Sequence, residues 1–205
     1  MCGAGWRGCG SRRAILLDYP PTDDIAAGAT GWGDAMDHAT RKIVLEAVKT
    51  AIITELRGLE IYKAAAERTA DPAAKQMFHA LAEDERHHKE FLEKNFKSLL
   101  ESGEWSVPAT PENLSPLDHS DILTPEFLQR VKGGDFEMAV VAAGCQLELS
   151  AINFYKKAAV ECPDEESAKV FGFLADWEAE HLESLARLEE RMKDQYFADL
   201  GFSPM

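Results

Sequence analysis

Apolar residues recur at steps of three and four along four long segments of the chain, at about 37–69, 72–101, 135–161 and 164–197. This spacing places the apolar side chains on one face of an α-helix, and the strict alternation typical of a half-buried strand is nowhere sustained. None of the nine prolines lies in the interior of a segment, where it would remove a backbone hydrogen bond. The pattern therefore predicts an all-α protein with four long helices.

The ends of these segments carry residues that begin helices. Asp71 precedes Pro72 and Asp164 opens the fourth segment; aspartate is a favoured N-cap, and proline is favoured at the first helical position. Between the second and third segments, residues 102–134 hold four prolines and one expected helical turn after Thr124. That connection is too long for a hairpin loop. We therefore predict two hairpins, 37–101 and 135–197, joined by a long crossover, which is the topology of a ferritin-like four-helix bundle.

The first 35 residues differ from the rest of the chain. They contain seven of the 14 glycines, together with Trp6 and Trp32, and show no helical spacing. We predict an irregular N-terminal tail over residues 1–35, followed by the bundle over residues 36–200. Helical spacing begins just after Met36, so a translation start at Met36 also fits the pattern.

The charge of the chain narrows its partners. It has 22 basic and 36 acidic residues and a formal charge of −14, which repels nucleic acid and anionic membrane surfaces. The longest notable apolar stretch, residues 138–145, is far shorter than the roughly 20 residues that cross a bilayer. Residues 14–17 are too short for the core of a signal peptide. We expect a cytoplasmic protein with neither nucleic acid nor a membrane as partner.

The four cysteines, Cys2, Cys9, Cys145 and Cys162, form no CxxC pair. A disulfide framework, a zinc ribbon and a rubredoxin-type iron site are therefore not expected. Cys145 lies in the third predicted helix and is expected to be a small core residue.

Each predicted helix carries ionisable residues on its apolar face. On the first helix that face includes Glu55 and Tyr62, and on the second it includes Glu85 and, one turn later, His88. The third and fourth helices repeat the pattern with an offset of 93 residues, and the corresponding residues are Glu148, Tyr155, Glu178 and His181. A duplicated helical hairpin explains the repeat, because neither hairpin could bury its apolar face alone.

Packing the two hairpins together would bring four glutamates into one core. Buried carboxylates without partners are costly, whereas two divalent cations would balance their four negative charges. A shell of carboxylate oxygen and imidazole nitrogen suits iron or manganese. One glutamate from each of two helices and a Glu-x-x-His pair from each of the others is also the arrangement of di-iron and di-manganese bundles. We therefore predict a metal site with the ligands Glu55, Glu85, His88, Glu148, Glu178 and His181.

Each motif alone has a simpler explanation. A single glutamate on a helix lies more often at a solvated edge, and a single Glu-x-x-His pair is more often a surface coincidence. Two copies at one spacing favour the metal site. His87 competes with His88, because Asp84 lies three residues before it, but the repeat favours His88, since the residue 93 positions after His87 is Glu180.

The two tyrosines, Tyr62 and Tyr155, lie two turns after Glu55 and Glu148 on the same faces. Their hydroxyl groups either hydrogen-bond the metal ligands and fix their orientation, or the rings pack simply as core residues. Both roles fit the spacing.

The chain resembles the rubrerythrin branch of the ferritin-like superfamily over residues of about 40–195, at Glu55, Glu85-Arg86-His87-His88, Glu148 and Glu178-Ala179-Glu180-His181. The resemblance implies a non-haem di-iron site and peroxide reduction or, as in related branches, oxidation and storage of ferrous iron. Two features depart from the family pattern. A rubredoxin module with paired CxxC motifs is missing, and Ala151 stands where rubrerythrins have a further glutamate.

Three functions are compatible with these residues. The first is an oxidoreductase of peroxidase or ferroxidase type, in which two iron ions, or manganese in their place, react with peroxide or O2. The second is iron binding without catalysis, as a buffer or as a subunit of a storage assembly for Fe(II). The third, a metal-free interaction bundle, leaves the buried carboxylates unexplained. We expect the first, in a homo-oligomer of at least two chains and with an external electron donor.

Overall fold

The computed structural model describes residues 36–107, 124–132 and 134–201. The helices in these ranges are α1 (His38–Arg68), α2 (Pro72–Glu101), α4 (Pro125–Leu128), α5 (Asp135–Glu161) and α6 (Glu165–Asp199). No strand occurs in the described ranges, which confirms the all-α prediction. The predicted tail, and residues 108–123 of the predicted crossover, lie outside the described residues.

The helices begin where the sequence places their caps. The side chain of Asp71 accepts hydrogen bonds from the backbone N–H groups of Ala73 and Ala74, and Asp164 accepts one from Ser167. Asp37 caps α1 in the same way, so α1 starts one residue later than predicted. α6 continues two residues beyond its predicted end. These bonds satisfy backbone donors that a helix start would otherwise leave unpaired.

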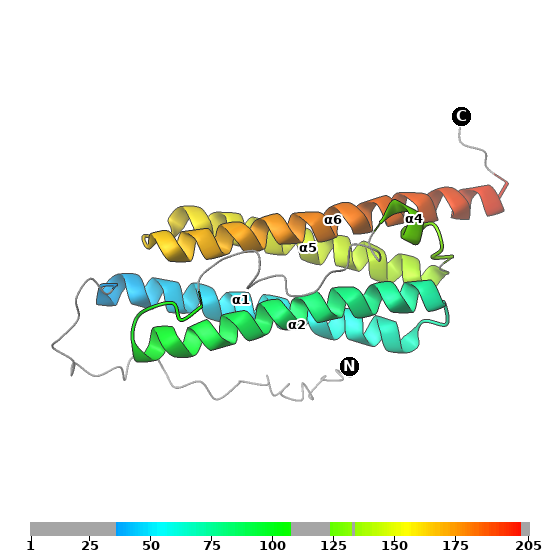
Figure 1. The fold of residues 1–205 in the computed structure, drawn as a ribbon. Coiled ribbons are helices and arrows are strands. Elements are labelled where there is room, and N and C mark those ends of the chain that lie inside the picture. The colour runs from blue at the N-terminus through cyan, green and yellow to red at the C-terminus, as the bar shows by residue number, and fades with distance from the viewer. Residues whose placement is uncertain (1–35, 108–123, 133, 202–205) are drawn as a thin grey trace, which may run out of the picture. The chain divides into compact units, whose positions relative to one another are not determined.

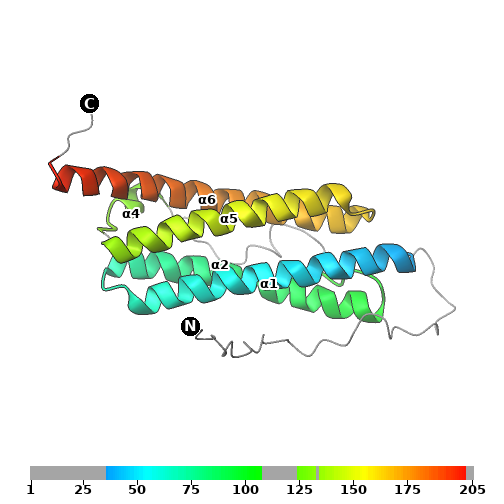
Figure 2. The ribbon, with the colours of Figure 1, turned by 180° about the vertical axis from the view of Figure 1, so that it is seen from behind.

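Two helical hairpins make up the bundle. α1 packs along α2, and α5 packs along α6. Figures 1 and 2 show the hairpins side by side, with α1 next to α5 and the two helices running in opposite directions. Each hairpin turns its apolar face toward the other, so the centre of the bundle is enclosed by all four long helices. This is the predicted ferritin-like four-helix bundle.

The start of the crossover is fastened to both hairpins. The side-chain oxygen of Asn95, a fully buried residue of α2, accepts hydrogen bonds from the backbone N–H groups of Ser106 and Val107 at 3.0 Å each. The indole N–H of Trp105 donates to the hydroxyl of Ser167 on α6 at 3.0 Å. These contacts direct the chain from the end of α2 toward the start of α6.

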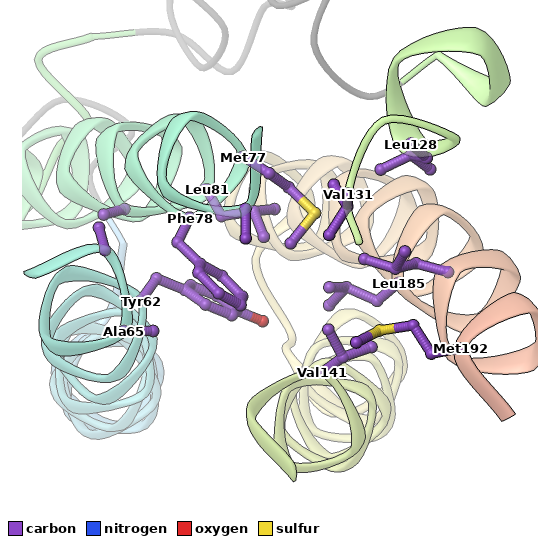
Figure 3. Close-up of a cluster of buried hydrophobic side chains, with 14 of the residues drawn as sticks. Tyr62, Ala65, Met77, Phe78, Leu81, Leu128, Val131, Val141, Leu185 and Met192 are labelled. Atoms are coloured by element: carbon purple, nitrogen blue, oxygen red, sulfur yellow. The ribbon is translucent and has the colours of Figure 1, made fainter. Parts of the chain in front are cut away.

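A cluster of apolar side chains fills the end of the bundle beside α4 (Figure 3). Tyr62 stacks on Phe78, with ring centroids 6.5 Å apart, and Leu128 and Val131 cover this end from the α4 segment. The Tyr62 hydroxyl points into the space between the hairpins (Figure 3). The cluster therefore closes one end of the bundle and holds Tyr62 in a fixed direction.

Among the described helices, α5 alone is long and apolar enough, by length and composition, to cross a membrane, with a mean hydropathy of 1.2. It is packed along α6 and buries Glu148 and Tyr155 inside the bundle, while its outer side leaves Leu149 and Val160 exposed. Core helices of soluble bundles commonly have such a composition, so this one helix is weak evidence for a membrane span.

Candidate metal centre

Three acidic or basic residues from each hairpin meet in the middle of the bundle. We call them the six-residue cluster: Glu55 of α1, Glu85 and His88 of α2, Glu148 of α5, and Glu178 and His181 of α6. Each is at most 3% exposed. The structure thus brings together all six residues that the repeat singles out, in an interior where isolated charges are unfavourable.

The cluster divides into two overlapping groups of donor atoms. The His88 group consists of Glu55, Glu85, His88 and Glu178, and the His181 group of Glu85, Glu148, Glu178 and His181. Within each group, one ligand atom from every residue lies within 4.8 Å of the others. Glu85 and Glu178 belong to both groups. They can therefore bridge two cations, while the remaining glutamate and histidine of each group serve one cation each.

Both imidazoles turn the same nitrogen, Nδ1, toward the carboxylates. Nδ1 of His88 lies 3.3 Å from Glu55 Oε2 and 3.4 Å from Glu178 Oε1. Nδ1 of His181 lies 3.2 Å from Glu178 Oε2 and 3.8 Å from Glu85 Oε1. The nitrogen available to a cation is therefore Nδ1 on both rings, and Nε2 is the outer nitrogen.

The two tyrosines hold glutamates of the opposite hairpin. Tyr62 on α1 donates its hydroxyl hydrogen to Oε1 of Glu148 on α5, and Tyr155 on α5 donates to Oε1 of Glu55 on α1. Burial, together with the nearby Glu148, raises the pKa of Tyr62 well above its usual value, and burial with Glu55 does the same for Tyr155. Both hydroxyls therefore stay protonated and remain donors near neutral pH.

Two further residues contact the outer side of the cluster, and sequence reasoning did not identify either in this role. Asp84 on α2, 4% exposed, places Oδ2 at 3.3 Å from His181 Nε2. The half-buried Trp177 on α6 places its indole nitrogen 3.1 Å from the same atom. His87, the competitor of His88, lies outside the cluster and contacts Arg86 instead.

The metal-free cluster balances its charges with protons. Burial and the neighbouring Glu178 raise the pKa of both Glu85 and Glu148 well above the usual carboxyl value. Burial alone would lower the pKa of His88, but contacts with Glu178 and Glu55 raise it to about 10. Although burial opposes ionisation of Glu178, its contacts with His181 and His88 hold its pKa well below the usual value. Cations would take over the role of these protons.

The donor set fits a pair of divalent cations. Oε1 of the buried Glu178 makes no hydrogen bond within the described residues, although a carboxylate oxygen in the interior normally has a partner. Carboxylate oxygens and imidazole nitrogens, without a thiolate, match the preferences of iron and manganese. Calcium and magnesium seldom take imidazole, and structural zinc sites are usually rich in cysteine.

A cavity of about 240 Å³ reaches the cluster between α1 and α5. The cluster's four glutamates line it together with Gly58 and Ala151, which occupy equivalent positions of the repeat. Its remaining lining includes the exposed residues Thr50, Arg57 and Ser150. The cavity thus connects the carboxylates to the surface, and the small side chain of Ala151 adds no carboxylate to it.

Comparison with protein families gives a match over a range that includes the candidate metal centre. The model of the family described as Rubrerythrin matches residues 46–189, a range that begins within α1, ends within α6 and includes the whole six-residue cluster. Comparison with curated proteins and with solved structures gives no match.

Proposed function

Because the chain belongs to the rubrerythrin family, we propose that it is a di-iron oxidoreductase that reduces hydrogen peroxide with electrons from a separate donor. The observation that supports this proposal best is the pair of overlapping donor groups that share Glu85 and Glu178. Two cations held side by side can act together on one small substrate, which two unconnected sites cannot do.

In this proposal the six-residue cluster holds two iron ions. Glu85 and Glu178 would contribute to both ions, Glu55 and His88 would hold one of them, and Glu148 and His181 would hold the other. Two ferrous ions held there would supply the two electrons that, with two protons, convert one peroxide molecule to two water molecules. The 205 residues contain no CxxC pair, and in this proposal a separate donor supplies the electrons that restore the ferrous state.

The tyrosines prepare the carboxylates for this task. Tyr62 and Tyr155 each occupy Oε1 of one glutamate, so Oε2 of Glu148 and of Glu55 is the oxygen available to a cation. Side chains that orient metal ligands in this way commonly affect metal affinity by about 10- to 100-fold. The aromatic rings also exclude water from this side of the cluster.

The cavity between α1 and α5 supports a small neutral substrate. Outside the cluster, the described residues of its lining include hydroxyl groups and one cationic residue, Arg57, but no acidic residue. Such an entrance suits peroxide or O2, whereas a ferrous ion would meet the positive charge of Arg57 before it reached the glutamates. This arrangement favours peroxide reduction over the alternative function, uptake and storage of iron as substrate.

Metal analysis tests the first part of the proposal. Protein purified with iron should contain about two metal ions per chain, and Glu85→Ala or His181→Ala should lower this content. His87→Ala and Glu180→Ala are matched controls, because both residues lie on the same helices but outside the cluster. If the protein keeps its helical fold but contains no metal after exposure to iron, the proposal is refuted.

Mixing experiments separate the two functions. Ferrous-loaded protein should be oxidised rapidly by a stoichiometric amount of peroxide, and adding excess Fe(II) with O2 should produce no further iron uptake. Continued growth of bound iron in an oligomer would instead support storage. Substituting Ala151→Leu should narrow the cavity and slow the oxidation by peroxide without removing a member of the cluster.

A further inference from the structure

The internal repeat is broken at a position that contacts the histidines. The residue 93 positions after Asp84 is Trp177, so the two halves of the bundle carry a carboxylate and an indole at equivalent points. Each lies directly before a glutamate shared by both donor groups, Glu85 or Glu178. Identical halves would give both histidines the same neighbour. Here they have different ones.

The outer nitrogen of His181 faces a carboxylate. Its Nε2 lies 3.3 Å from Oδ2 of Asp84, which is 4% exposed. When Nδ1 of a neutral imidazole binds a cation, the ring proton resides on Nε2, and an acceptor there fixes the tautomer and the ring orientation. The negative charge of Asp84 also makes the imidazole a better electron donor to the cation.

The outer nitrogen of His88 has no such acceptor. Nε2 of His88 makes no hydrogen bond within the described part of the chain, although it is buried. The indole of Trp177 lies beside the ring, nearly perpendicular to it, with centroids 5.7 Å apart. An indole nitrogen donates hydrogen bonds and cannot accept them. With a cation on Nδ1 of His88, no acceptor on Nε2 fixes the tautomer or the orientation of the ring, unlike the case of His181.

Trp177 lies against the same nitrogen of His181, with its Nε1 3.1 Å from Nε2. An indole N–H can only donate a hydrogen bond, so Trp177 cannot accept the proton of Nε2. Asp84 is therefore the residue that accepts from His181 when a cation occupies Nδ1.

We propose that the two metal sites are inequivalent: the His181 group binds the first cation tightly, and the His88 group binds the second more weakly. Asp84 is the positioning residue that creates the difference, because it acts on the cation through His181. The inference rests on the proposed function only in requiring that the cluster binds two cations.

Titration of the metal-free protein with Co(II), followed by calorimetry and visible absorption, tests this inference. Binding should occur in two distinct steps. Asp84→Asn keeps the size of the side chain but removes its charge, and should weaken the first step by about 10- to 100-fold while changing the second much less. Asp176→Asn is the matched control, since it makes the same change on the exposed side of α6 and should leave both steps unaltered.

Two further variants assign the steps to the sites. His181→Gln should remove the tight step, whereas His88→Gln should retain it and remove the weak one. Trp177→Phe should leave the tight step in place, because the carboxylate of Asp84 remains.

The possible results separate the inference from the proposed function. Two equal steps in the wild-type protein, or equal weakening of both by Asp84→Asn, would overturn the inequivalence and leave metal binding intact. A wild-type protein that binds no Co(II) at all would remove the proposed function together with the inference. If Asp84→Asn does not fold, the wild-type, His88→Gln and His181→Gln titrations still decide the question.

Discussion

The hydroxyl of Tyr62 donates a hydrogen bond to Glu148 across the boundary between the two hairpins. Tyr155 forms the corresponding bond to Glu55 in the opposite direction. Each hairpin therefore orients a glutamate that the other contributes to the cluster, and both bonds are buried. The hairpins are connected at the cluster itself as well as through the apolar core.

Replacing one tyrosine should weaken this connection. Tyr62→Phe removes a buried hydrogen bond to a carboxyl group, and should lower the free energy of unfolding of the metal-free protein by about 1.5–3 kcal/mol. It should also lower metal affinity by about tenfold, because Glu148 loses its fixed orientation. Urea unfolding followed by circular dichroism measures the first effect. The exposed Tyr196→Phe is the control, and an equal loss in both variants would contradict the role given to Tyr62.

Gly58 should be needed for metal binding and not for helix formation. A Cβ atom at this position would lie 3.0 Å from Cδ of Glu85 and would displace its carboxyl group. Gly58→Ala should therefore reduce metal affinity, even though alanine favours a helix over glycine by about 1 kcal/mol. In Gly172→Ala, the added Cβ meets no atom within 4 Å. That control should gain stability and keep its metal affinity, as thermal unfolding and Co(II) titration can show.

Metal binding should release protons and strengthen with pH. The pKa of His88 is raised to about 10 by Glu178 and Glu55, against the effect of burial, and the pKa of His181 is raised in the same way by Asp84 and Glu178. Both rings are thus protonated between pH 6 and 8 in the metal-free protein, and a cation must displace these protons. The affinity should rise by about tenfold per pH unit for each proton displaced. Calorimetry in buffers of different ionisation enthalpy counts the protons; affinity that is constant over this range would contradict the expectation.

Asn95 should contribute to stability by holding the start of the crossover. Asn95→Ala leaves the backbone N–H groups of Ser106 and Val107 without their acceptor, and should lower the free energy of unfolding by about 2 kcal/mol. Asn153→Ala, on the exposed side of α5, should have little effect. Urea unfolding of the two variants compares them directly, and equal stabilities would show that the crossover is held elsewhere.

The helices could be predicted from the sequence because their signals are local. Each of these signals involves only a few neighbouring residues: the helical spacing of apolar residues, the positions of the prolines, and the caps at Asp71 and Asp164. The observed ends of α2 and α5 coincide with the predicted ones. The six-residue cluster could be singled out for a different reason. Its members lie on apolar faces and recur after 93 residues, so the repeat identifies them without knowledge of how the hairpins pack.

The contacts between the hairpins could not be predicted in this way. Helical spacing places Tyr62 on the face of Glu55, but its hydrogen bond goes to Glu148, because the partner depends on how the hairpins dock. Asp84 meets His181 from the other half of the chain for the same reason. The cavity beside Gly58 and Ala151 likewise depends on the spacing of α1 and α5. The mismatch of Asp84 and Trp177 in the repeat was the one available sign of their role.

The difference between Asp84 and Trp177 has a consequence for how such a centre can be encoded. If a single hairpin paired with an identical copy, every residue would occur twice by symmetry, and both histidines would have the same neighbour. Such a symmetric pair could not place a carboxylate behind one histidine and an indole beside the other. Joining both hairpins in one continuous polypeptide removes that restriction, because each position can then be mutated and selected independently. The long crossover is the covalent link that permits the two halves to specialise.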